Sequence, residues 1–192
     1  MLLLTLGLLV FIGIHSLRIG GDALRARWIA SLGPARFKVL YTLVSLVGFT
    51  MVVYGFGIAR DTPIVLWTPP PIMKPVAYFL TLVAMVFMAA VYVPRNAIKA
   101  KLHHPMVLSV KVWALAHLLV NGTLAHLLLF GSMLVWSVLL FKTSRARDRV
   151  DQVVYAPGNL ASTFLTLEVG IAAWLVLLGW AHGWLIGVQV MP

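Results

Sequence analysis

The six histidines are the residues of this chain whose chemistry stands out. They share the sequence with only five Asp and Glu residues and with no cysteine. The lack of cysteine excludes thiol catalysis, Cys-ligated zinc and iron–sulfur clusters. Neutral imidazole is a ligand for haem iron, copper and zinc, so this inventory favours a histidine-bound metal or cofactor. No two histidines stand four residues apart and no H-E-x-x-H motif occurs, which excludes the zinc sites built on those spacings.

Composition decides what kind of element must position these histidines. The 192 residues are 61% hydrophobic and 10% charged, with a mean hydropathy of +0.99. A soluble domain carries about a quarter charged residues, so this chain could not cover itself with a polar surface. We therefore expect an all-α, polytopic membrane bundle that forms a single domain over residues 1–192.

Apolar runs near the length needed to cross a bilayer predict six transmembrane helices. A span needs about 20 predominantly apolar residues, and the first and fourth runs are the shortest. The predicted spans are Leu2–Leu17, Phe37–Ala59, Pro75–Val93, Pro105–Val120, Thr123–Phe141 and Phe164–Ile186. The first run lacks a basic start and a small-residue cleavage site, so we interpret it as a span rather than a signal peptide. A short interfacial helix is predicted near residues 22–32.

The positive charges alternate between the two ends of these spans. Of the 15 Lys and Arg residues, 12 fall in loops on one side, two fall on the other, and Lys111 lies inside span four. Lys and Arg are retained on the cytoplasmic side of membrane proteins. We therefore expect a multi-pass protein of the bacterial inner membrane with both termini in the periplasm. This topology explains the formal net charge of +10 without nucleic acid as a partner.

Depth in the bilayer divides the histidines into two groups of three. If odd-numbered spans run inward, the inner half holds His15, His103 and His104, and the outer half holds His117, His126 and His182. His104 and His117 are 13 residues apart, so at about 100° per residue they point in nearly opposite directions and cannot share one metal.

Each histidine also has a plainer explanation than ligand binding. Ionisable groups inside spans usually mark function, but His126 and His182 are equally explained by hydrogen bonds across helices. His103 fits a solvated interfacial residue, and His104, before Pro105, fits a helix cap. The residue types alone therefore leave the ligand role of the remaining two histidines, His15 and His117, open.

Apart from Lys38 at the start of span two, Lys111 is the only amine inside the predicted spans, and Glu168 is the only carboxylate. Their positions place them at similar depth on two helices that both run outward. A buried unpaired charge is expensive, so we expect spans four and six to be neighbours joined by a Lys111–Glu168 ion pair. The alternative is that the lysine extends to the interface and the glutamate caps its helix.

Glycine, proline and tryptophan positions predict several local features. Gly179, Gly183 and Gly187 recur every four residues, which favours close helix packing within the chain or, alternatively, a homodimer. Asn121-Gly122 predicts a tight turn between spans four and five. Three consecutive prolines in residues 68–71 predict a stiff outer loop, and Trp67 and Trp184 are expected in the outer aromatic belt.

Motifs along nearly the whole chain resemble the NnrU family. The longest is the span-four block, in which His103-His104-Pro105 is followed by Lys111, Trp113 and a terminal run from Ala116 to Gly122. The others are Gly13–Ser16 with Arg18 and Arg25, Arg36 with Tyr41–Leu46, Leu128–Ser132, and Ala181–Val188. The long block is specific, whereas each of the others is short.

The resemblance implies a haem site. The family is associated with nitrite and nitric oxide reduction in denitrifying bacteria, and it is similar to plant zeta-carotene isomerase, a membrane haem enzyme with two axial histidines. Carried over by motif, His15 and His117 are the axial iron ligands of a haem b, and His104 belongs to the same site. Arg18, one turn from His15, is expected to pair with a haem propionate or, as an equally open alternative, to extend to the membrane interface as one of the arginines that set the topology. His126 has no family role in this comparison.

The depths of His15 and His117 in the bilayer restrict how the two residues could bind one haem. The α-carbons of His15 and His117 should differ in depth by about 10 Å in a core of about 30 Å. A haem ligated by both would therefore need a tilted plane, or span four, which is short, would have to start below the interface.

We expect such a protein to transfer electrons, to sense redox state, or to act as a redox-gated isomerase-like enzyme. Its partners would be the lipid bilayer, a redox partner, and nitric oxide or a lipophilic substrate. One alternative is a haem-free accessory or assembly protein of nitrogen-oxide respiration. Another is an enzyme that resembles isoprenylcysteine methyltransferases, which the uncharged tail after Ile186 disfavours.

Overall fold

The computed structural model describes residues 1–190, and these residues form an all-α bundle without a β-strand. This confirms the expected fold class. The elements are α1 (Leu2–His15), the 3-10 turn η1 (Ser16–Arg18), α2 (Asp22–Leu32), α3 (Pro34–Asp61), α4 (Met73–Tyr92), α5 (Ala97–Leu102), α6 (Pro105–Val120), α7 (Leu124–His126), the π-helix η2 (Leu127–Gly131), α8 (Ser132–Val150), α9 (Leu160–Val176), the π-helix η3 (Leu177–Ala181) and α10 (His182–Ile186).

Four continuous helices are long and apolar enough to cross a membrane: α3, α4, Leu124–Val150 and Leu160–Ile186. Leu2–Arg18 passes the same criterion only together with α2, from which it is bent by 90°. Helix α6 has 16 residues and is too short by length alone. All six predicted spans therefore form helices, while the crossing of the membrane by α1 and α6 stays a prediction.

The helix ends follow signals in the sequence. Pro34 and Pro105 occupy the first turns of α3 and α6, where the missing N–H group costs no hydrogen bond. Gly33 ends α2 with a φ of +78°, a value that glycine adopts without strain. The side chains of Asn96 and Asn159 accept hydrogen bonds from the first turns of α5 and α9. These signals set the α1–α2–α3 elbow and the start of the last long helix.

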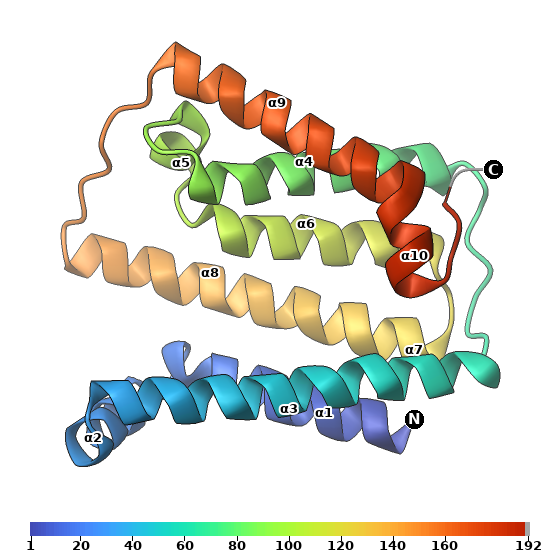
Figure 1. Cartoon of the computed structure of the whole chain (residues 1–192), viewed down its shortest axis with the longest axis horizontal. Helices are drawn as coiled ribbons and strands as arrows, with labels where there is room; N and C mark the ends of the chain where they lie inside the picture. The colour runs from blue at the N-terminus through green and yellow to red at the C-terminus, as the bar shows by residue number, and fades with distance from the viewer. Residues whose placement is uncertain (191–192) are drawn as a thin grey trace.

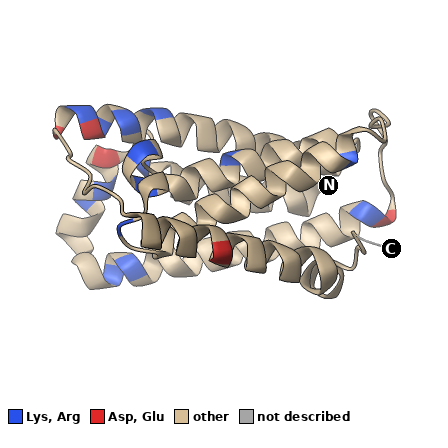
Figure 2. Ribbon diagram, turned by 90° about the horizontal axis from the view of Figure 1, so that it is seen from above, with Lys and Arg blue, Asp and Glu red and all other residues tan. Residues whose placement is uncertain are grey.

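The long helices pack side by side as an antiparallel layer, in which α1 lies against α3, α8 follows, and α6, α4 and α9 complete the order (Figure 1). Ser109 of α6 donates a hydrogen bond to the carbonyl of Ala84 in α4 at 2.7 Å, and Trp174 of α9 donates to Thr81 of α4 at 3.1 Å. Lys and Arg gather at one end of the bundle (Figure 2). The start of α1 and the end of α10 lie at the opposite end (Figure 1), as an even number of crossings requires.

Glycine allows α1 and α3 to pack at very short distance. A Cβ at Gly7 would meet the Val52 backbone at 2.7 Å, and a Cβ at Gly55 would meet the Leu4 backbone at 2.4 Å, so no larger residue fits either position. The sequence also predicted close helix packing through glycines of span six, but these glycines do not pack against another helix. A Cβ at Gly179 meets nothing within 4 Å, and α9 packs instead through Gly170 against Val86.

The remaining glycines of that set also make no helix contact. A Cβ at Gly187 would meet nothing within 4 Å, and one at Gly183 would meet only the side chain of Gln189. The prediction of intrachain packing through this stripe is therefore wrong. Within residues 1–190, the stripe faces no neighbouring helix, because a four-residue repeat does not show which side of a helix meets its neighbours.

The predicted local features at the two ends are present. Helix α2 forms, and none of its residues is buried, as an interfacial helix requires. The Asn121-Gly122 turn joins α6 to α7, and the Gly122 carbonyl accepts hydrogen bonds from the backbone of Leu66 and Trp67 at 2.8 and 3.1 Å. The outer loop that holds Trp67 therefore lies across this turn.

The predicted Lys111–Glu168 ion pair is wrong. No ion pair between them occurs in the described chain, and the Lys111 ammonium lies 5.9 Å from the ring centroid of Phe141 on α8. Helix α9 packs on α4 rather than on α6, and Glu168 is exposed. A depth inferred from the sequence does not fix which helices are neighbours.

Candidate functional site

His15 lies at the end of α1 among aromatic rings. Its Nδ1 donates a hydrogen bond to the Phe11 carbonyl at 2.6 Å, which fixes the tautomer because a carbonyl can only accept. The Nε2 lone pair is therefore free. The rings of Tyr41 and Trp136 stand edge-on to the imidazole, with centroids 5.4 and 6.2 Å away.

Trp136 next to His15 carries a buried indole N–H group with no hydrogen-bond partner. Such an unpaired buried donor costs about 1–3 kcal/mol and usually marks a missing acceptor. The two rings are neighbours, with centroids 6.2 Å apart, and no hydrogen bond joins them within the described residues. This corner of the bundle therefore offers both an electron-pair donor and an N–H donor to a further group.

His117, near the end of α6, has the same hydrogen-bond arrangement. Its Nδ1 donates to the Trp113 carbonyl at 2.8 Å, which leaves Nε2 free. The ring stacks on Phe130 of η2 with centroids 4.5 Å apart and lies 5.0 Å from the ring of Trp113. We refer to His15 and His117 as the aromatic-lined histidines.

The two aromatic-lined histidines approach the same helical segment, η2–α8, from α1 and α6. Their ring contacts on it, Trp136 and Phe130, are six residues apart, which corresponds to about 9 Å along a helix axis. That offset agrees with the difference in depth expected from the sequence. Whether the two imidazoles share one iron stays a prediction.

The other outer histidines surround His117. The His126 ring also stacks on Phe130, with centroids 5.9 Å apart, and its Nδ1 is hydrogen-bonded to the Thr123 hydroxyl at 2.6 Å. His182 bonds the Val188 carbonyl at 2.9 Å. Both lie within electrostatic range of His117, so the three histidines predicted for the outer half are grouped in the structure.

A second cluster lies at the cation-rich end, centred on Asp148 of α8. Its Oδ2 accepts hydrogen bonds from His104 Nε2 at 2.8 Å and from the Tyr155 hydroxyl at 3.0 Å. His103 Nδ1 and the Arg145 guanidinium lie 3.6 and 3.7 Å from the same oxygen. The Asp148 side chain is only 13% exposed. We call Asp148, His103, His104 and Tyr155 the Asp148 network.

The backbone that presents the two histidines of this network is strained. His103 has φ +58° and ψ 163°, and His104 has φ +39° and ψ 48°. Residues other than glycine rarely adopt such values, and each costs of order 1–3 kcal/mol. The strain aims both rings at one carboxylate, and the His103 ring packs on Tyr155 with centroids 3.8 Å apart. The expectation of a solvated His103 is therefore wrong.

Tyr155 is held as a neutral phenol. Burial raises its pKa above the ordinary value of 10.0, and the hydrogen bond to Asp148 and the charge of that carboxylate raise it further, opposed by Arg145. A raised pKa means that this contribution to stability is complete below about pH 10 and is lost as the pH rises through the folded-state pKa. The Tyr155 hydroxyl therefore remains a hydrogen-bond donor to Asp148 throughout the neutral range.

Arg18, the predicted propionate partner, is engaged with protein groups. Its guanidinium lies 3.2 Å from Asp22, and its backbone carbonyl accepts a hydrogen bond from Arg147 at 2.6 Å. The ion pair is about half exposed, so the guanidinium can exchange partners at little cost. His104, also predicted to bind cofactor, directs Nε2 at Asp148 instead, and its haem role stays a prediction.

The chemistry of the donors can be tested against the implied haem. Between residues 1 and 190, no group of three or more His, Asp or Glu side chains is arranged to hold a metal ion. A haem needs only two axial donors. The aromatic-lined histidines supply two Nε2 lone pairs, and Trp136 supplies an N–H group that lacks an acceptor within the described residues. These residues fit the group.

Sequence reasoning missed three residues that matter here: Trp136, Asp148 and Tyr155. Asp148 lies 44 residues from His104, in the segment 142–149, whose sequence is typical of a basic loop between membrane spans. The one available signal was a lone acidic residue among Lys142, Arg145, Arg147 and Arg149.

Comparison with known proteins gives one match. The family model described as NnrU protein matches residues 3–190, which is nearly the whole chain. No curated protein and no solved structure matches it.

Proposed function

Because the chain belongs to the NnrU family, we propose that it is a membrane b-type haem protein with His15 and His117 as axial ligands. The single observation that carries the proposal is the shared arrangement of these two residues. Each donates Nδ1–H to the carbonyl one turn earlier and keeps Nε2 free. Metal-binding histidines use such a bond at the second nitrogen to fix the ring and raise its basicity.

The surrounding residues support the same function. Phe11, Tyr41, Trp113 and Phe130 wall the two imidazoles with aromatic rings, which exclude water and favour an apolar, planar group. Trp136 offers a donor to an acceptor on such a group. Arg18 lies at the cation-rich end, where its guanidinium can leave Asp22 for a carboxylate of the ligand.

Electron transfer or redox sensing is the activity that this donor set supports best. A haem held by two imidazoles exchanges single electrons and has no open coordination site for a substrate. The family resemblance favours nitrogen-oxide respiration as the setting. Conversion of nitric oxide or of a lipophile would require one of the two histidines to release the iron.

An absorption spectrum tests the proposal. The full chain, purified from membranes in detergent and supplied with haem, should show a Soret band that shifts when dithionite is added. The haem should be present in stoichiometric amount. A colourless, folded protein that gains no such band when haem is added would contradict the proposal and would favour the haem-free accessory role.

A further inference from the structure

A groove of about 570 Å³ lies at the cation-rich end, between η1, α2 and α3. Its walls are apolar and include Leu17, Ile29 and Phe37, while Arg18, Arg25 and Lys38 also line it. No carboxylate lines the groove. It therefore combines an apolar surface with an excess of positive charge.

The positive charge in the groove is largely uncompensated. The nearest acidic residue, Asp22, is engaged by Arg18 at 3.2 Å and by Arg147 at 3.8 Å. Within residues 1–190, neither Arg25 nor Lys38 takes part in an ion pair. Arg25 lies instead over the ring of Phe37, 5.7 Å from its centroid, which holds the guanidinium at the rim of the apolar wall.

The groove lies where a bilayer surface is expected. Helix α2 turns by 90° from the first helix, and Leu24, Trp28 and Leu32 on it are 36–42% exposed although they are large and apolar. A helix with exposed apolar residues beside arginines lies in the headgroup region. The groove between α2 and α3 therefore opens at the depth of lipid phosphates.

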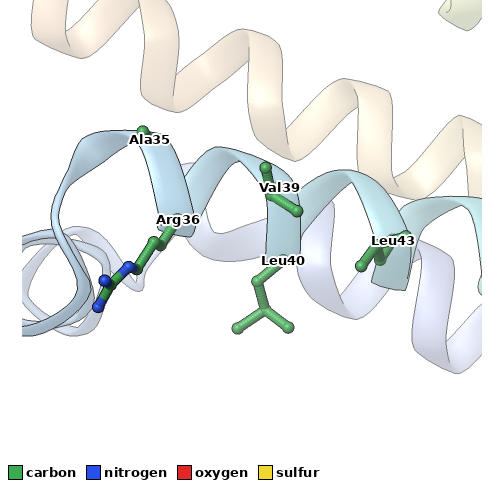
Figure 3. A pocket seen from close by; sticks show the side chains of 5 residues that line it. All are labelled: Ala35, Arg36, Val39, Leu40 and Leu43. Atoms are coloured by element: carbon green, nitrogen blue, oxygen red, sulfur yellow. The ribbon is translucent and has the colours of Figure 1, made fainter.

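The opposite face of α3 provides a contrast at the same depth. There a shallow hollow of about 330 Å³ is lined by Ala35, Arg36, Val39, Leu40 and Leu43 (Figure 3). It has a single cation and no facing helix. This is what an ordinary lipid-facing helix surface offers, whereas the groove adds two further cations and a second wall.

We propose that the groove between α2 and α3 binds an anionic phospholipid, with the phosphate held by Arg25 and Lys38. The apolar wall of Leu17, Ile29 and Phe37 takes the start of an acyl chain. The apolar wall is the reason to assign a lipid rather than a free anion, because a small anion gains nothing from it. Basic pockets on the cytoplasmic side of membrane proteins bind lipid headgroups in this way. Arg25 and Lys38, which hold the phosphate, have no part in the proposed haem site, whereas Arg18 and Tyr41 border both sites.

Native mass spectrometry of the detergent-purified full chain tests the assignment. Phosphatidylglycerol is titrated, with phosphatidylcholine as the neutral lipid and inorganic phosphate as a competitor. Arg25→Gln and Lys38→Gln should each weaken retention of phosphatidylglycerol by about fivefold, since one basic side chain near an anionic lipid is worth about that factor. Arg36→Gln, on the opposite face of α3, is the matched control and should retain the lipid.

Each variant is first checked for unchanged helix content and a single gel-filtration peak. Arg25→Lys keeps the charge and should retain most of the binding, which separates charge from a packing defect. Equal weakening in Arg36→Gln would show that only the overall charge matters and would overturn the proposal. Displacement of the lipid by inorganic phosphate, or equal retention of phosphatidylcholine, would also overturn it.

Discussion

Two regions of this bundle use histidine in opposite ways. The aromatic-lined histidines each have one ring nitrogen bonded to a carbonyl of their own helix and the other free. In the Asp148 network, His104 Nε2 is hydrogen-bonded to the largely buried Asp148 carboxylate, while His103 Nδ1 lies 3.6 Å from it without a hydrogen bond. In the first region each histidine keeps one ring nitrogen available to a ligand. In the second region, Nε2 of His104 is already bound by the protein.

The difference teaches where to look for a bound group. A histidine hydrogen-bonded to a carboxylate has a structural role. The strained backbone at His103 and His104 persists because the surrounding contacts offset its cost. A histidine with a free Nε2 beside an unpaired Trp136 N–H is incomplete in the protein alone. The predictions below alter one region and leave the other as the reference.

The largest effect on stability is expected from Asp148→Ala. The substitution leaves His104 Nε2 and the Tyr155 hydroxyl without an acceptor, so the free energy of unfolding should fall by about 2–3 kcal/mol. Unfolding by SDS in mixed micelles measures it. Asp151→Ala, three residues later and exposed, is the control and should change little. Equal losses in both would show that the network is an ordinary surface contact.

The backbone strain at His103 gives a somewhat smaller effect. His103→Gly and His103→Ala both lose the ring that packs on Tyr155, but only glycine relieves the φ of +58°. The glycine variant should therefore be about 1–2 kcal/mol more stable than the alanine variant in the same SDS titration. An alanine variant of equal or greater stability would contradict the strained geometry.

Trp136→Phe separates the two regions through ligand retention. The substitution removes the unpaired N–H group and keeps an aromatic ring next to His15. Haem retention should weaken by about tenfold, the value of one hydrogen bond of about 1.4 kcal/mol. The unfolding free energy of the haem-free protein should change little, because the lost packing is offset by the loss of an unsatisfied donor. Unchanged haem retention would remove Trp136 from the site.

The smallest effect concerns Lys111 and Glu168, which belong to neither region. Because Lys111 lies over Phe141 and α9 packs on α4, Lys111→Met and Glu168→Gln should have additive effects on unfolding. A double-mutant cycle should give a coupling energy of about 0.5 kcal/mol or less. A coupling of several kcal/mol would restore the ion pair predicted from depth.

The sequence was sufficient for the helices because their signals are local. Apolar runs, Pro34, Pro105, Gly33 and the Asn121-Gly122 turn each act within a few residues. The charge bias predicted that the cations gather at one end. All of these features depend on periodicity and on backbone chemistry near the residue concerned.

The contacts between helices could not be predicted in the same way. Depth gives each residue one coordinate only, so it placed Lys111 and Glu168 at one level but not on facing helices. The Asp148 network requires a left-handed backbone at His103 and His104 and a carboxylate 44 residues away. Neither is encoded in a local pattern, and for this reason the network was missed.

The most direct test of the haem proposal uses glycine variants of single histidines in the haem-loaded protein. His15→Gly and His117→Gly should each abolish the low-spin, two-imidazole spectrum, and added imidazole should restore it by entering the space left by the side chain. His126→Gly, whose ring stacks on the same Phe130 as that of His117, should keep the spectrum. Retention of the low-spin spectrum in either of the first two variants, or its loss in the third alone, would contradict the assignment of the axial ligands.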